Sequence, residues 1–256
     1  MAGARLGQNF LVDRIVAQKI VAAFLPFPGP VLEVGPGKGI LTEQLAGRAS
    51  PLILVDVDPL LCGELELRFA SVTRVMCADI RTVDPGLLFS GAEFGLIGNL
   101  PFLISSEMID WIIGHHALIR KGVIMVQREF AAKLLAAAGS RERNGRGVAF
   151  QSVFRRRRLF RVLSGSFRPI PKVAGQVIAF ERRDPPLLPD PVSFHRFLAT
   201  AFSSPRKTLL NNLTPSFPEN RLQEAFECDG LGQSCRVAEL ELDSLVRLFN
   251  RLTGGC

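Results

Sequence analysis

The chain has 256 residues, of which 47% are hydrophobic and 21% are charged, and this composition excludes a disordered or fibrous protein. Its length accommodates one large α/β domain with a small additional domain. No apolar run approaches the ~20 residues of a membrane span, and no secretory or transit pattern opens the chain, so we expect a cytoplasmic protein with no membrane partner.

The net charge of +7 favours a polyanionic partner, with nucleic acid as the leading class. The five cysteines show neither the paired spacing of a zinc site nor an even-numbered disulfide framework, and we expect free thiols. The three histidines are far in sequence from any cysteine or carboxylate cluster. We therefore predict no metal site.

Short apolar, β-rich runs alternate with helix-length stretches over the first half of the chain. We predict strands over residues 31–34, 52–57, 74–77, 94–97 and 122–126. We predict helices over residues 13–24, 40–46, 59–69, 105–113 and 128–138, with Asp13, Asp58 and Ser105 as caps. This alternation predicts a parallel sheet with helices on both faces.

The second half of the chain no longer shows the regular alternation of strands and helices. Two β-like runs, 159–163 and 176–181, predict an antiparallel pair that closes the edge of the sheet. Four prolines within residues 184–191 predict a domain boundary, which divides the chain into 1–184 and 185–256. Helical spacing over residues 194–202, 222–226 and 237–252 predicts a small helical domain at the end.

A glycine-rich loop follows the first predicted strand. Gly35, Gly37 and Gly39 stand between this strand and the next predicted helix, where glycines allow a sharp turn and a close approach of a ligand to the backbone. The spacing differs from the dinucleotide fingerprint, and Pro36 lacks an amide that could hold a pyrophosphate. A ligand loop is therefore favoured, and a nicotinamide dehydrogenase is disfavoured.

Two carboxylates follow the next two predicted strands. Asp56 ends the second strand, a position from which a carboxylate can bind both hydroxyls of an adenosine ribose. The alternative is a helix cap, a role that Asp58 fits better. Asp79 follows the third strand and is similarly placed for an adenine amino group, with an N-cap or an Asx-turn as the alternative.

The tetrapeptide Asn99-Leu100-Pro101-Phe102 follows the fourth strand, at the edge of such sheets where ligands bind. Other motifs accompany it in order along the chain: Gly7-Gln8-Asn9-Phe10-Leu11, Glu33-Val34-Gly35-Pro36-Gly37, Val55-Asp56-Val57-Asp58, Ala78-Asp79, Phe167-Arg168-Pro169-Ile170-Pro171-Lys172-Val173 and Arg206-Lys207-Thr208. In these motifs the chain resembles the ribosomal RNA adenine N6,N6-dimethyltransferases, especially their small-subunit branch.

This resemblance implies a Rossmann-like methyltransferase sheet, mostly parallel with an antiparallel C-terminal edge, plus a small all-helical C-terminal domain. It implies S-adenosylmethionine as the cofactor, and it makes residues 1–184 the catalytic domain. The residues that it places at the cofactor are Gln8, Asn9, Leu11, Gly35, Gly37, Asp56, Asp79 and Asn99. The residues that it places at the chemical step are Asn99, Leu100, Pro101 and Phe102.

The tetrapeptide also has a chemical rationale of its own. The N6 amine of adenine is a poor nucleophile because its lone pair is delocalised into the ring. If the Asn99 side-chain oxygen and the Leu100 carbonyl each accept one N6 hydrogen, the lone pair can point at a sulfonium methyl group. Pro101 would stiffen this arrangement, and Phe102 would stack on an extruded base. The alternative, a proline turn that caps a core strand, explains only Pro101.

The chain departs from the family at two places. Relatives often carry tyrosine where this chain has Phe102, so a hydroxyl contact is lost while stacking remains. Asn144-Gly145-Arg146-Gly147 stands where relatives often have a Tyr-Gly pair, and the shape of that wall of the target pocket stays open.

Basic residues cluster near the last predicted strands. The run Arg155, Arg156, Arg157 and Arg158 predicts a rim that contacts RNA phosphates, with a solvated strand edge as the alternative. Arg206 and Lys207 extend the basic surface into the second domain. We expect a cleft between the domains to hold folded RNA.

Our first hypothesis is that the protein dimethylates two adjacent adenosines near the 3′ end of small-subunit ribosomal RNA, as a monomer that meets the small ribosomal subunit. The resemblance supplies this target. The enzymatic alternative is a large-subunit adenine methyltransferase of the erythromycin-resistance type. A noncatalytic ribosome-assembly factor with this fold is the third reading, but pure binding would need neither the glycine loop nor Asn99.

Overall fold

The computed structural model of the protein describes residues 8–254, and their contacts divide into two compact units. Unit 1 comprises the described residues through Ala131 together with Arg156–Arg182, and unit 2 comprises Ala132–Arg155 together with the described residues from Arg183 onward. This division differs from a single boundary after residue 184. The segment 132–155 groups with the C-terminal helices because α7 (Gly145–Val153) packs against α8 (Pro191–Ala201).

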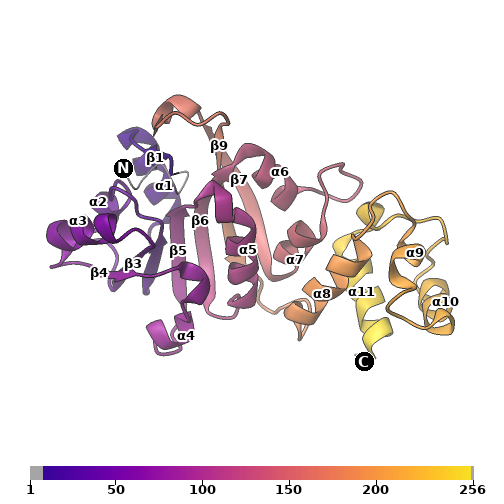
Figure 1. Cartoon of the computed structure of the whole chain (residues 1–256). Helices are drawn as coiled ribbons and strands as arrows, with labels where there is room; N and C mark the ends of the chain where they lie inside the picture. The colour runs from indigo at the N-terminus through magenta and orange to yellow at the C-terminus, as the bar shows by residue number, and fades with distance from the viewer. Residues whose placement is uncertain (1–7, 255–256) are drawn as a thin grey trace. The chain divides into compact units, whose positions relative to one another are not determined.

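Unit 1 is built on a seven-stranded sheet with the strand order β4-β3-β2-β5-β6-β9-β7 (Figure 1). The strands are β2 (Val31–Val34), β3 (Leu52–Asp56), β4 (Arg74–Cys77), β5 (Phe94–Asn99), β6 (Ile119–Gln127), β7 (Phe154–Val162) and β9 (Gly175–Arg182). Strands β4, β3, β2, β5 and β6 run parallel, and β9 is antiparallel to β6. The predicted mostly parallel sheet with an antiparallel edge is confirmed.

Helices connect these strands and cover the sheet, with α5 lying in front of it in Figure 1. They are α1 (Arg14–Phe24), α2 (Thr42–Leu45), α3 (Pro59–Phe69), α4 (Pro85–Leu88), α5 (Ser105–Gly114) and α6 (Arg128–Leu135), with the 3-10 turns η2 (Ile80–Thr82) and η3 (Phe102–Ile104). Every residue of β2 and β3 is buried. This burial agrees with the sequence prediction of a parallel sheet covered by helices on both faces.

Two of the three predicted helix caps are present. The Asp13 carboxylate accepts hydrogen bonds from the Ile15 and Val16 amides at 3.0 and 3.1 Å, and the Asp58 carboxylate accepts one from Leu60 at 3.0 Å. The prediction for Ser105 is wrong. This serine is the first residue of α5, and its hydroxyl donates backwards to the Pro101 carbonyl at 3.1 Å.

A second, two-stranded sheet joins distant parts of unit 1. Strand β1 (Phe10–Leu11) pairs antiparallel with β8 (Phe167–Arg168), which follows the 3-10 turn η4 (Ser164–Ser166). The Ser166 hydroxyl also donates to the Asp13 carboxylate at 3.0 Å. This pairing fixes the segment that begins at Gln8 beside the glycine loop; Gly7 lies outside the described residues.

Unit 2 is helical apart from the first two residues of β7. Its helices after the proline-rich segment are α8, α9 (Leu209–Leu213), α10 (Glu219–Cys228) and α11 (Leu242–Thr253), with the 3-10 turn η5 (Val237–Glu239). Phe194 packs edge-on against Phe249 with ring centroids 5.3 Å apart, which joins α8 to α11. The predicted helical C-terminal segment is confirmed.

Candidate active site

A pocket opens in unit 1 at the carboxyl ends of β2, β3 and β5. It encloses about 1250 Å³ when the part open to solvent is counted. In the parallel register Val34 stands level with Val55 and with Gly98, so the segments that leave these strands meet at one edge of the sheet. All the predicted cofactor and catalytic residues line this pocket: Gln8, Asn9, Leu11, Gly35, Gly37, Asp56, Asp79, Asn99, Leu100, Pro101 and Phe102.

The glycine loop crosses the pocket with left-handed backbone at Gly35 (φ +64°) and Gly37 (φ +54°). A Cβ on Gly35 would lie 3.4 Å from the Asn99 carbonyl oxygen, and one on Gly37 would lie 2.9 Å from the Phe10 ring. The left-handed backbone favours glycine at both positions, and at Gly37 the close Phe10 ring also leaves no room for a side chain. The loop therefore brings backbone amides close to any ligand in the pocket.

Asp56 ends β3, is 6% exposed, and is held in place by the backbone. Its two carboxylate oxygens accept hydrogen bonds from the Asp58 amide at 3.0 Å and the Gly37 amide at 3.3 Å. Burial raises the pKa of Asp56, and these hydrogen bonds oppose the rise. The side chain is thus a preoriented acceptor, and Asp58 takes the helix-capping role.

The Asp79 side chain has two roles in the structure. It lines the pocket, and it also caps η2 by accepting the Arg81 amide at 3.0 Å. The Arg81 side chain pairs with the same carboxylate at 2.5 Å, and this hydrogen bond is the main reason that the pKa of Asp79 is lowered. Asp79 therefore caps η2, as the alternative interpretation expected, and it also lines the pocket.

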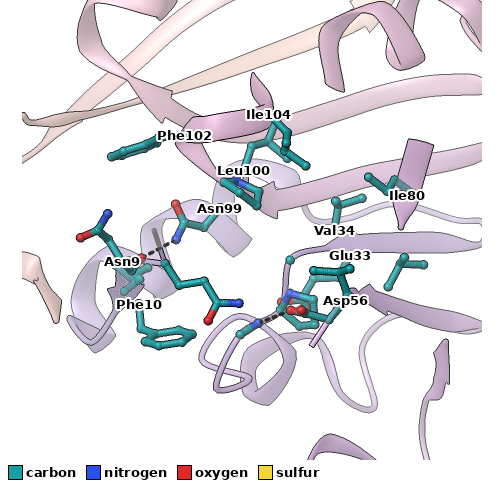
Figure 2. Close-up of a pocket in the computed structure, with 18 of the residues that line it drawn as sticks. Asn9, Phe10, Glu33, Val34, Asp56, Ile80, Asn99, Leu100, Phe102 and Ile104 are labelled. Atoms are coloured by element: carbon teal, nitrogen blue, oxygen red, sulfur yellow. Dashed lines mark hydrogen bonds between the residues drawn. The ribbon is translucent and has the colours of Figure 1, made fainter. Parts of the chain in front are cut away.

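Asn99, the last residue of β5, is the central polar group on the opposite side of the pocket from Asp56 (Figure 2). Its side-chain nitrogen donates to the Asn9 carbonyl at 3.3 Å, which fixes the orientation of the amide. Its side-chain oxygen is buried and has no hydrogen-bond partner. A buried acceptor without a partner destabilises a fold by about 1–3 kcal/mol unless a ligand satisfies it.

The rest of the tetrapeptide is rigidly held. The Leu100 amide donates to the Met125 carbonyl at 3.0 Å, and the Leu100 side chain is buried. Pro101 directly precedes the turn η3, whose Ile104 amide donates to the Pro101 carbonyl at 3.2 Å. Phe102 is half-buried, and Figure 2 shows its ring beside the same part of the pocket as Asn99.

Glu33 is a pocket residue that the sequence prediction did not include in the site. It is completely buried in β2, and one carboxylate oxygen accepts the Thr42 hydroxyl at 2.8 Å. The other oxygen has no partner, and burial raises the pKa of Glu33 to about 8. Sequence offered one signal, a glutamate inside an otherwise apolar strand directly before the glycine loop. This free oxygen can accept a hydrogen bond from a ligand.

The predicted RNA-binding residues are outside the residues that line the pocket. Arg155 to Arg158 lie in β7 at the edge of the sheet, where all but Arg156 are exposed. Arg206 and Lys207 are exposed between α8 and α9 in unit 2. The segment Asn144 to Gly147 forms the start of α7, where Asn144 accepts the Gly147 amide at 2.9 Å.

Two further findings concern residues 8–254. No group of three or more histidine, cysteine, aspartate or glutamate side chains is arranged to hold a metal ion in this part of the chain. None of the helices described is both long enough and apolar enough to cross a bilayer.

The family model for ribosomal RNA adenine dimethylase matches residues 2–254. The chain belongs to this family. It is an enzyme that uses S-adenosylmethionine to dimethylate adenine in ribosomal RNA.

Individual relatives of this dimethylase cover nearly its whole length. Ribosomal RNA small subunit methyltransferase A of Acidobacterium capsulatum is 36% identical, over 97% of this chain and 90% of the relative. The protein of the same name from Koribacter versatilis is 34% identical, over 98% and 95%.

Two solved structures share the fold of this dimethylase. The 23S rRNA methyltransferase ErmE has a TM-score of 0.74 at 28% identity, over 96% of this chain and all of ErmE. A dimethyladenosine transferase from Plasmodium falciparum has a TM-score of 0.83 at 23% identity, over 96% and 98%.

Proposed function

We propose that this dimethylase acts on small-subunit ribosomal RNA, where it methylates N6 of two adjacent adenosines near the 3′ end during ribosome biogenesis. Its partner is then the small ribosomal subunit, which it meets in the cytoplasm as a monomer. The names of the two bacterial relatives support this target. The Arg206-Lys207-Thr208 element, in which Thr208 caps α9, is the further feature that resembles the small-subunit branch.

The observation that carries the proposed chemistry is the partnerless side-chain oxygen of Asn99. Because the amide nitrogen donates to the Asn9 carbonyl, this oxygen is left to accept a hydrogen bond from a donor that enters the pocket. Together with the Leu100 carbonyl it would accept the two N6 hydrogens of adenine, which leaves the nitrogen lone pair free to attack a methyl group. Pro101 keeps the two acceptors in register, and Phe102 stacks on the base.

The other side of the pocket fits the cofactor. Asp56 would accept hydrogen bonds from the ribose hydroxyls, and Asp79 would accept one from the adenine amino group. The free oxygens of Glu33 and Gln8 are acceptors for the ammonium group of the amino-acid part. Asn9, Leu11 and the backbone at Gly35 and Gly37 would complete the contacts.

When bound, S-adenosylmethionine supplies a methyl group that its sulfonium already activates. The protein therefore has mainly to position the adenine amine and to exclude competing geometries. After each transfer the surplus N6 proton leaves to water, so the site needs no strong general base. This agrees with a target side made of an amide, a carbonyl and an aromatic ring.

The arginines of β7 would contact RNA phosphates. Arg155, Arg157 and Arg158 are exposed on this edge strand, where they can neutralise phosphate charge. Arg156 of the same run, with Arg206 and Lys207 in unit 2, would add to this electrostatic attraction. Contacts of this kind orient the RNA without reading its bases.

The decisive experiment incubates the protein and radiolabelled S-adenosylmethionine with unmethylated small subunits, with large subunits and with naked ribosomal RNA. We expect label in small-subunit RNA, mapped as N6,N6-dimethyladenosine at two neighbouring positions. Label confined to large-subunit RNA would overturn the proposed target. It would instead support the second candidate, a large-subunit enzyme, which the full-length likeness to ErmE favours.

A further inference from the structure

Two leucines near the end of β5 line the pocket with very different exposure. Leu100 and Leu103 both line it, but Leu100 is 1% exposed and Leu103 is 70% exposed. Leu100 belongs to the core, whereas Leu103 contributes little to it. Single exposed leucines are common on protein surfaces, so the position of Leu103 at the mouth of the active site is what calls for an explanation.

The backbone that carries Leu103 is well fixed. Leu103 is the middle residue of η3, and the Ile104 amide closes this turn onto the Pro101 carbonyl at 3.2 Å. The Ser105 hydroxyl, buried at the start of α5, adds hydrogen bonds to the carbonyls of Pro101 at 3.1 Å and Phe102 at 3.3 Å. The exposed side chain is therefore displayed from a rigid turn directly beside the proposed stacking residue.

Extrusion of a base explains what such a side chain can bind. An adenosine that leaves its stack exposes the apolar face of the nucleotide beside it. Proteins that unstack nucleic acids commonly cover such a face with an apolar side chain, and leucine is one of those used. Leucine carries no polar group that would have to be desolvated, and its contact does not depend on base identity.

We propose that Leu103 is a positioning residue that packs against the nucleotide next to the target adenosine. This inference rests on the proposed function, because it needs an RNA substrate whose target base enters the pocket beside Asn99 and Phe102. With two adjacent targets, the covered neighbour is itself an adenosine at one of the two steps. Because the contact does not depend on base identity, loss of Leu103 should weaken RNA binding at both steps.

The test compares Leu103→Ala with the wild-type protein on whichever ribosomal subunit the wild type methylates. We expect KM for that subunit to rise roughly tenfold, which equals about 1.4 kcal/mol, with kcat little changed. Affinity for S-adenosylhomocysteine and the thermal midpoint should stay at wild-type values, because the side chain is exposed and stands on the target side. Leu103→Met, which keeps an apolar side chain of similar size, should restore most of the KM.

The matched control is Leu67→Ala, which removes a leucine that is 90% exposed on α3 and outside the pocket. An unchanged KM for the RNA in Leu103→Ala would overturn the inference. A loss of S-adenosylhomocysteine affinity that accounts for the whole defect would also overturn it, since Leu103 would then serve the cofactor. Wild-type label on large subunits would refute the proposed target alone, because the Leu103 comparison is still made on the wild type's own substrate.

Discussion

The two sides of the pocket are built from opposite chemistry. The side formed by β2 and β3 holds two buried carboxylates, Glu33 at 0% and Asp56 at 6% exposure. The side formed by β5 and η3 holds an amide, a backbone carbonyl and an aromatic ring, none of which carries charge. The carboxylate of Asp56 on the first side and the uncharged groups on the second side support the proposed placement of a positively charged cofactor and a neutral base.

Asp56 and Asn99 also differ in how complete their hydrogen bonding is before a ligand binds. Asp56 already has hydrogen bonds to both of its oxygens, so this carboxylate is oriented by the fold. Asn99 has its nitrogen satisfied and its oxygen without a partner, so the target side is completed only by a donor from outside. Substitutions on the first side should therefore affect cofactor affinity, and those on the second side should affect turnover and RNA recognition.

The largest expected effect is that of Asn99→Ala on the methyl-transfer rate. Removal of one aligned acceptor should lower kcat by about 10²–10³-fold, by analogy with the loss of a preorganised hydrogen-bonding group in other active sites. RNA affinity should change little, because the proposed phosphate contacts lie outside the pocket. Single-turnover methylation and filter binding measure the two quantities, and Asn211→Ala, at an exposed position on α9, is the matched control. Near-normal turnover would remove Asn99 from its proposed role.

A smaller effect is expected from Asp56→Asn on the cofactor side. The amide keeps the shape but loses the charge and one acceptor, and hydrogen bonds to charged groups contribute about 1.5–3 kcal/mol each. We expect cofactor affinity to fall by about 10- to 100-fold in calorimetry, while RNA affinity is kept. Asp84→Asn tests whether loss of any capping aspartate has this effect, because Asp84 caps α4 and does not line the pocket. Equal cofactor affinity in Asp56→Asn and wild type would contradict the division between the two sides.

Much of the first side could be predicted from sequence because its signals are local. Short sequence patterns predict the strand, the glycine loop and the carboxylate at the end of the next strand. The parallel register of the two strands then brings Asp56 beside Gly37. Glu33 escaped prediction because burial is not local. Nothing in the sequence shows that one of its oxygens is satisfied by Thr42 and that the other has no partner.

Tertiary packing explains the elements that were mispredicted. Helix α7 contains Gly145 and Gly147, which are poor helix formers, and no helix was predicted there. A Cβ on Gly147 would lie 2.3 Å from the Lys133 carbonyl oxygen, so close packing requires glycine and overrides its low propensity. Strand β7 begins at Phe154 rather than at residue 159, because an edge strand tolerates the arginine run that a central strand could not bury.

The buried carboxyl group of Glu33 should make the stability of the fold depend on pH. Burial raises its pKa from 4.5 to about 8, so between these values the folded state holds a proton that the unfolded state has lost. The free energy of unfolding should therefore fall as pH rises through this window. Glu33→Gln should flatten that slope and be more stable than wild type at the alkaline end. Urea unfolding at several pH values measures it.

The control for this pH dependence is Glu66→Gln, which removes an exposed glutamate on α3. It should keep the wild-type slope. Glu33→Gln should also weaken cofactor binding, because the side chain can no longer be ionised toward a cationic ligand. An identical pH slope in Glu33→Gln and wild type would show that Glu33 is not the buried acid on the cofactor side.

The smallest expected effect comes from Phe102→Tyr, and it sharpens the description of the target side. If stacking alone recognises the base, a hydroxyl on the half-buried ring should change KM for the RNA by less than about twofold, whereas Phe102→Ala should lose the ~1–3 kcal/mol of base stacking. Cofactor affinity should be unchanged in both variants. A large gain in turnover for Phe102→Tyr would contradict a wholly apolar stacking surface, since a phenolic hydrogen bond would then contribute to the target side of the pocket.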